Sequence, residues 1–153
     1  MVGALKQRIA DEMKAALLGG DRFVGETLRN LKAAILNEEV ATGKRDEGLS
    51  DEAVEKVIAR EVKKRGESAK LYRENNRPEL ADPEEAEAEV LKKFLPEQLS
   101  EAELQAIVEQ KIAELGAAGP AAMGQVIGAV KAAVGNKADG ATLATIVKTT
   151  LSK

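Results

Sequence analysis

The residue types that most often perform catalysis are missing from this chain. Its 153 residues include no histidine and no cysteine, which removes imidazole bases, thiolate nucleophiles and nitrogen or sulfur zinc ligands. The serines therefore have no histidine base to activate them. The three aromatic residues are too few to form a platform on which successive nucleobases stack. We expect no catalytic residue, no cofactor and no bound metal.

Paired glycines and acidic runs suggest phosphate or metal chemistry only at first sight. Gly20 and Gly25 have the spacing of a phosphate-binding loop, as do Gly119 and Gly124. Neither pair follows a strand, and neither is followed by the lysine that such a loop requires. We interpret them as turn and helix-packing glycines. The acidic runs Glu38-Glu39 and residues 84–89 fit solvated helix surfaces with partners four residues away.

The basic residues are distributed unevenly. The chain holds 23 lysines and arginines against 26 acidic residues, a net charge of −3. Residues 78–99 hold two basic and seven acidic residues, whereas residues 121–153 hold four lysines and one aspartate. The C-terminal end is therefore locally basic, and the total charge alone does not exclude an RNA partner.

Two basic surfaces are candidates for contact with phosphate. One is the turn before the last expected helix, where a helix N-terminus offers free amides to an anion. Lys131 and Lys137 lie close to this turn in the sequence, and Lys148 lies further along. The alternative is that Asp139 caps these amides and no external anion binds them. The other is an arc of basic residues on the third helix, which could equally be a solvated face with ion pairs. The residues of this arc are Arg60, Lys63, Lys70, Arg73 and Arg77.

Helices must position these residues, because apolar residues recur at spacings of three and four and no stretch alternates with a period of two. Serine or aspartate precedes five of the expected helices as an N-cap, and Ser100 with Glu103 forms a capping box. We expect helices over about residues 3–18, 22–41, 51–74, 83–94, 101–115, 123–134 and 140–151.

The fourth helix has two possible starts. Asp82 followed by Pro83 has the pattern of a cap and a first helical residue; alternatively the helix begins near Glu79, with Pro83 in its first turn. Its expected apolar residues are Ala86, Val90, Leu91 and Phe94.

Composition changes after Pro96, where the helices become shorter and richer in alanine and glycine. We therefore expect an all-α protein with an elongated N-terminal four-helix domain over residues 1–96. A compact C-terminal three-helix domain would follow over residues 97–153.

The N-terminal residues do not resemble a signal peptide, since charged side chains occur among them at helical spacing. No apolar run approaches the roughly 18 residues that cross a bilayer. We expect a soluble, cytoplasmic monomer with no membrane partner.

Three stretches resemble a known family. They are Arg-Asn-Leu-Lys-Ala-Ala-Ile at residues 29–35 with Glu39, Leu-Pro-Glu-Gln-Leu-Ser at residues 95–100, and Met-Gly-Gln-Val-Ile at residues 123–127 followed by Lys-Ala-Asp-Gly at residues 137–140. In this order and spacing they resemble the YqeY-like family, also called GatB/YqeY domain proteins, over the whole chain.

The resemblance implies an all-helical protein with a small C-terminal three-helix domain. That domain is similar to the tail domain of the B subunit of the tRNA-dependent amidotransferase, which contacts the tRNA body. Gly124, Lys137 and Asp139 fall on the shared pattern, whereas Lys131 and Lys148 are added for their charge. Asn136 stands where the pattern has glycine, and asparagine tolerates left-handed geometry there.

The expected function is a non-catalytic tRNA-binding or tRNA-metabolism accessory protein that contacts RNA backbone through Lys131, Lys137, Lys148, Gly124 and Asn136. The alternative is a helical protein-interaction module that docks on a protein partner in tRNA amidation. A component of a glutamine-dependent carbon–nitrogen ligase is the least favoured reading, because no catalytic constellation is visible.

Overall fold

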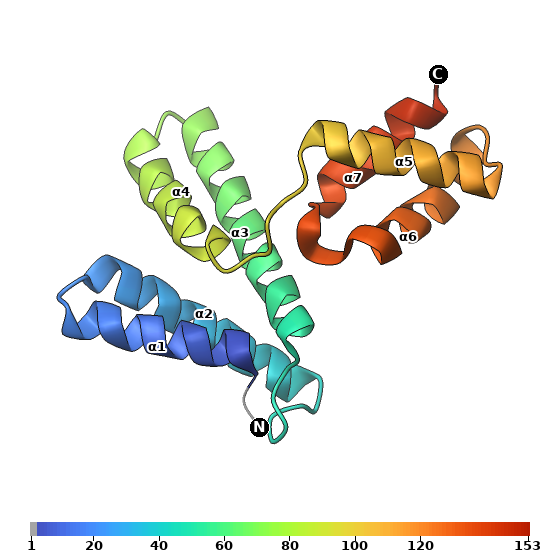
Figure 1. The fold of residues 1–153 in the computed structure, drawn as a ribbon. Coiled ribbons are helices and arrows are strands. Elements are labelled where there is room, and N and C mark those ends of the chain that lie inside the picture. The colour runs from blue at the N-terminus through green and yellow to red at the C-terminus, as the bar shows by residue number, and fades with distance from the viewer. Residues whose placement is uncertain (1–2) are drawn as a thin grey trace. The chain divides into compact units, whose positions relative to one another are not determined.

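The computed structural model describes residues 3–153, and within them every regular element is a helix (Figure 1). This confirms the predicted all-α fold. Two short 3-10 helices, η1 at Pro120–Ala122 and η2 at Gly135–Lys137, flank α6. The α-helices are α1 (Ala4–Leu18), α2 (Arg22–Ala41), α3 (Asp51–Glu74), α4 (Pro78–Lys92), α5 (Glu101–Leu115), α6 (Met123–Val134) and α7 (Gly140–Leu151).

Local side-chain chemistry sets the start of most helices. The side chain of Asp21 accepts a hydrogen bond from the Val24 amide, and that of Ser50 accepts one from the Ala53 amide. At α5 the full capping box forms, with the Ser100 hydroxyl and the Glu103 carboxylate each bonding the other residue's amide. These contacts satisfy amides that have no partner inside the helix, and they confirm the predicted caps.

Of the two expected starts of the fourth helix, the one near Glu79 agrees with the structure to within one residue, and the one at Asp82–Pro83 is wrong. Pro78 is its first residue, and Pro83 lies inside the helix. Pro83 has no amide hydrogen to donate to the carbonyl of Glu79, so one bond of the helix is missing. The earlier start is favoured because it brings Ala81, which is fully buried, into the helix.

The chain divides into two compact units, the first ending at Leu95 and the second running from Pro96 to Lys153. In the first unit, α1 and α2 form one helical hairpin and α3 and α4 form another. Their shared core contains Ile9 from α1, Leu31 from α2, Ile58 from α3 and Leu91 from α4. Phe94, just after α4, closes this core, and the Arg8 guanidinium lies 4.7 Å from the centre of its ring.

The outer part of the α3–α4 hairpin is held together without large apolar side chains. Ala69 of α3 and Ala81 and Ala88 of α4 are its buried residues. The expected core position Ala86 is exposed instead, because residues 81, 88 and 91 share the buried face of the helix and residue 86 lies on the opposite side. Small side chains let the two helices approach closely, and ion pairs between them supplement this packing.

A buried ion pair joins three segments of the first unit. The expectation that Glu39 lies on a solvated face is wrong, since this residue of α2 is 1% exposed. Its carboxylate accepts hydrogen bonds from Lys6 Nζ at 2.7 and 2.9 Å and from the Leu49 amide at 3.0 Å. Burial by itself raises the pKa of this carboxyl, but the bonds from Lys6 and Leu49 outweigh it and lower the pKa. The loop before α3 is thereby tied to α1 and α2.

The second unit is built on its own core. Leu104 and Val108 of α5 pack with Val126 and Val130 of α6 and with residues of α7. The buried α7 residues are Leu143, Val147 and Leu151. The spacing of three and four within each set places one apolar stripe on each helix, and the three stripes enclose the core.

Candidate nucleic-acid interface

The turn between α6 and α7 has a conformation that requires glycine at one position. Gly135 has φ 56° and ψ −130°, a region that side-chain-bearing residues avoid. The expectation that Asn136 adopts left-handed geometry is wrong, since Asn136 has a negative φ. The reversal is made one residue earlier, at Gly135, and this frees Asn136 and Lys137 to continue as the short helix η2.

The segment that enters α5 braces this turn. The Leu99 amide donates to the carbonyl of Lys137 at 2.8 Å, and Gln98 Nε2 donates to the carbonyl of Asn136 at 3.0 Å. Gln98 Nε2 also bonds the carbonyl of Pro96 at 2.8 Å. The stretch at residues 95–100 and the stretch at residues 137–140 are therefore in direct contact, which holds the backbone of Lys137 in place.

Asp139 occupies the free amides at the start of α7. Its Oδ2 accepts hydrogen bonds from the Thr142 amide and the Thr142 hydroxyl, both at 3.0 Å. A carboxylate thus stands where an anion would bind at this helix N-terminus. Of the two interpretations of this turn, the structure shows the cap.

The lysines of α6, η2 and α7 remain available for an external anion. Lys131, Lys137, Lys148 and Lys153 are exposed, and none makes an ion pair with a described residue. Lys131 and Lys148 lie in the last turns of their helices, where the helix dipole stabilises a positive charge. Lys148 is nine residues along the chain from Asp139, about 13 Å along the helix axis at 1.5 Å per residue, so the lysines are spread over the unit.

One face of α6 beside these lysines is bare. Gly124 is exposed, and a Cβ built on it would meet no atom within 4 Å. Gly128, which the sequence patterns did not single out, has the same surroundings. Because residues four and seven apart share a helix face, Gly124, Gly128 and Lys131 lie along one side of α6, and an RNA backbone could approach closely there.

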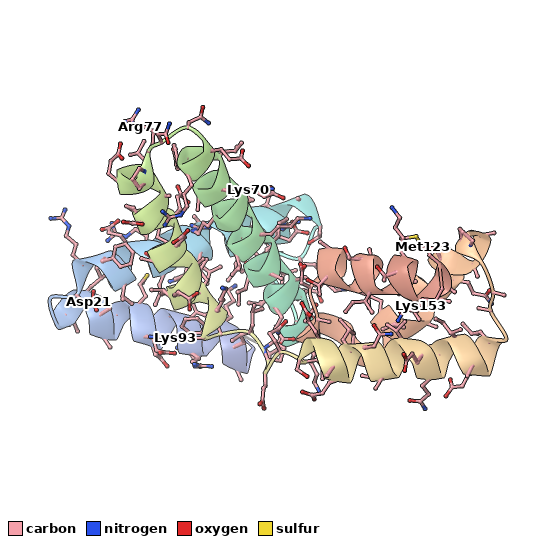
Figure 2. All side chains as sticks on the ribbon, turned by 90° about the horizontal axis from the view of Figure 1, so that it is seen from above. Asp21, Lys70, Arg77, Lys93, Met123 and Lys153 are labelled. Carbon is pink, nitrogen blue, oxygen red and sulfur yellow. The ribbon has the colours of Figure 1, made fainter. Side chains whose placement is uncertain are left out.

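The basic arc of α3 is largely engaged within the first unit. Arg60 pairs with Glu38 of α2 at 3.0 Å, whereas Arg73 pairs with Asp82 and Glu85 of α4, each at 2.8 Å. Arg77, labelled at the α3–α4 turn in Figure 2, pairs with Glu79. Lys63 and Lys70 are exposed and form no ion pair with a described residue. The five residues therefore do not form one free positive surface.

The Arg73 contacts also change proton affinities. The hydrogen bonds to Glu85 and to Asp82 raise the pKa of Arg73, and the hydrogen bond from Arg73 lowers the pKa of Glu85. Both groups are exposed and charged at neutral pH. Arg73 is therefore engaged with carboxylates of α4.

Among residues 3–153, no three metal-ligating side chains gather into a group that could hold an ion. Within the same residues, no helix combines the length and the apolarity needed to cross a membrane.

Comparison with known families identifies the family of this chain. The model of the family described as "Yqey-like protein" matches residues 6–151. The chain belongs to the YqeY-like family. The resemblance carried by residues 29–39, 95–100 and 123–140 is thereby confirmed.

Two curated yeast proteins, each named "Altered inheritance of mitochondria protein 41, mitochondrial", are similar to this YqeY-like chain. The protein from Clavispora lusitaniae is 30% identical over 93 residues, which cover 61% of this chain and 52% of the relative. The protein from Lachancea thermotolerans is 30% identical over 111 residues, covering 71% and 58%. The matches thus span little more than half the length of these relatives.

Proposed function

We propose that this YqeY-like protein is a non-catalytic accessory protein of tRNA metabolism whose C-terminal unit binds the tRNA backbone. The observation that carries the proposal is the set of four exposed lysines in residues 121–153. The same stretch contains one acidic residue, Asp139, which is already engaged as a helix cap. Charges without internal partners contribute most to binding an external polyanion. The rigid turn at Lys137 adds a fixed point of contact.

The mode of binding follows from the available residue types. Lysine ammonium groups contact phosphates as point charges and do not read bases. The second unit contains no aromatic residue, so stacking on bases cannot supplement these contacts. Recognition would rest on the shape and charge of a folded RNA.

Filter binding with purified tRNA tests the proposal. Replacing Lys131, Lys137 and Lys148 together by alanine should make the negative slope of log affinity against log salt shallower by about 2 to 3. The same variant should bind tRNA about a hundredfold more weakly at 0.1 M salt. A matched variant, Lys14→Ala/Lys56→Ala/Lys93→Ala, removes the same charge from exposed positions of the first unit. It should bind nearly as well as the parent protein. Equal losses in both triple variants would reject the proposed surface.

A second candidate function is a docking module for a protein partner, for instance one that acts in tRNA amidation. It is favoured by the distribution of exposed large apolar side chains: among residues 3–153, seven lie in the first unit and one, Leu115, lies in the second. Partners that remain bound to the purified protein after RNase treatment would support this function over RNA binding.

A further inference from the structure

The two hairpins of the first unit diverge from one another (Figure 1), and a cleft of about 250 Å³ lies where they meet. Helices α2, α3 and α4 all contribute to it. We call it the inter-hairpin cleft and define it by Asn30 of α2, by Glu61, Lys64, Arg65 and Ser68 of α3, and by Glu84 and Glu87 of α4. Every one of these side chains is polar, which is unusual for a place where three helices converge.

Part of this cleft is an internal ion network. Glu61 accepts hydrogen bonds from Arg65 Nη1 at 3.2 Å and from Lys64 Nζ at 3.3 Å, and the side chains of Arg65 and Glu61 are almost fully buried. Arg65 Nε lies 3.4 Å from Glu87 Oε2 but has no hydrogen-bond partner, although it is buried. A buried donor without a partner is rare in folded proteins.

The other polar groups of the cleft are not engaged by the chain. Glu84 makes no ion pair or hydrogen bond with a described residue, and the side chains of Asn30 and Ser68 likewise have none. The two basic side chains of the cleft, Lys64 and Arg65, already contact Glu61. The one charge left without a partner is therefore the carboxylate of Glu84, which a cation from outside would complement.

Apolar side chains continue the cleft along each helix. Residues three, four and seven apart share one helix face. Phe23 precedes Asn30 by seven residues on α2, Leu71 follows Ser68 by three on α3, and Leu80 precedes Glu84 by four on α4. Their exposed fractions are 44%, 59% and 37%. On each of the three helices, one exposed large apolar residue thus shares a face with a residue of the polar floor; α2 also exposes Leu36 and Val40.

We propose that the inter-hairpin cleft binds a helix of a protein partner that presents a lysine or arginine flanked on both sides by apolar residues. The basic side chain would pair with Glu84 on the polar floor, and the apolar residues would contact Phe23 on one hairpin and Leu71 and Leu80 on the other. Such an occupant satisfies both features of the cleft, the unpaired carboxylate and the exposed apolar rim.

The charge of the floor argues against RNA in this cleft. Three carboxylates face two cations there, and residues 78–99 hold seven acidic residues against two basic ones. A phosphate backbone would be repelled by this surface. The inference therefore goes beyond the RNA-binding function proposed for the second unit, and it concerns different residues, a different unit and a different class of partner.

Photo-cross-linking identifies the occupant. The full chain carrying Phe23→p-benzoylphenylalanine is irradiated in living cells, and mass spectrometry maps the residues to which it is joined. The mapped segment, made as a labelled peptide, is titrated with the full chain in a fluorescence anisotropy assay. We expect a helix-forming segment with a central basic residue and apolar residues three or four positions to either side.

Variants of the full chain then test the pairing. Glu84→Lys should weaken binding of that peptide about tenfold or more, and Glu84→Gln should weaken it by a smaller factor. Leu71→Ser should also weaken it about tenfold, because the exposed leucine contributes contact area without supporting the core. Asp46→Lys, the matched control, makes the same charge change in the loop before α3, where Asp46 is exposed and forms no ion pair, and should leave binding unchanged.

Several results would overturn the proposal. They are an absence of any cross-link, cross-linking to RNA, to lipid or to a second copy of this chain, and a mapped segment without a basic residue. Equal effects of Glu84→Lys and Asp46→Lys would overturn it too. Melting curves by circular dichroism establish that each variant is folded, and tRNA binding by the Glu84 variants should equal that of the parent, which separates this test from that of the proposed function.

Discussion

At the scale of single residues, Glu39 is the clearest case of a charge that the fold depends on. A buried carboxylate is unfavourable unless it is paired and hydrogen-bonded, and Glu39 meets this condition through Lys6 and the Leu49 amide. Glu39→Gln would leave Lys6 without its partner. We expect the free energy of unfolding at pH 7 to fall by about 2 kcal/mol, measured by urea denaturation.

The pH dependence of this loss has a defined sign. The folded pKa of Glu39 lies below its ordinary value of 4.5, so the ionised carboxylate stabilises the fold above that value. The contribution is lost as pH falls from about 4.5 through the lowered pKa. The difference between wild type and Glu39→Gln should therefore shrink below about pH 4.5. The control Glu38→Gln, which removes an exposed ion pair with Arg60, should lower the free energy of unfolding by no more than about 1 kcal/mol. If the loss of stability caused by Glu39→Gln stayed constant from about pH 3 to 7, this would contradict the role assigned to the carboxylate.

At the scale of elements, the sequence was most informative where the chemistry is local. Ser50, Ser100 and Asp139 cap the helices that they were expected to cap, because an N-cap contact spans only three residues. The start of α4 was left open between two positions, Asp82–Pro83 and a residue near Glu79, because Pro78 and Pro83 both suit a first helical position. The choice between them depends on Ala81 packing against α3, which no local pattern reveals.

The candidate site divides in the same way. Lysines without nearby acidic residues can be counted in a sequence, so the exposure of Lys131, Lys137 and Lys148 without ion pairs to described residues could be anticipated. Their contact with RNA stays a prediction. The contact of Gln98 with the Asn136 turn could not be predicted in this way, because it joins residues 38 positions apart and depends on the tertiary fold. The arc of α3 failed as a free surface for the same reason, since Arg60 and Arg73 bond to carboxylates on other helices.

The alanine packing of the α3–α4 hairpin predicts a sharp contrast between two positions on one helix. Ala81 is fully buried, whereas Ala86 is exposed. Ala81→Leu should destabilise the first unit by about 1–3 kcal/mol, because three carbon atoms must fit between closely packed helices. Ala86→Leu should change stability by less than about 0.5 kcal/mol. Urea denaturation followed by circular dichroism measures both, and equal effects would contradict the described face of α4.

At the scale of the whole molecule, the two units differ in what they offer to a partner. The first unit pairs most of its arginines internally, and it carries seven of the eight exposed large apolar side chains among the described residues. The second leaves four lysines without ion pairs over a continuous stretch of 33 residues. A polyanion on one unit and a protein segment on the other would use separate surfaces. Substitutions should therefore be able to abolish either binding activity without affecting the other.

The same division predicts how the chain unfolds. The two cores share no buried residue, so a cavity in one does not remove contacts from the other. Leu31→Ala and Leu104→Ala make the same change in the first and second core, and each should cost about 3 kcal/mol within its own unit. Amide hydrogen exchange should therefore accelerate in α2 and α3 for Leu31→Ala and in α6 and α7 for Leu104→Ala. Acceleration of both groups by either substitution would mean that the units unfold as one cooperative body, and binding at one unit would then stabilise the other as well.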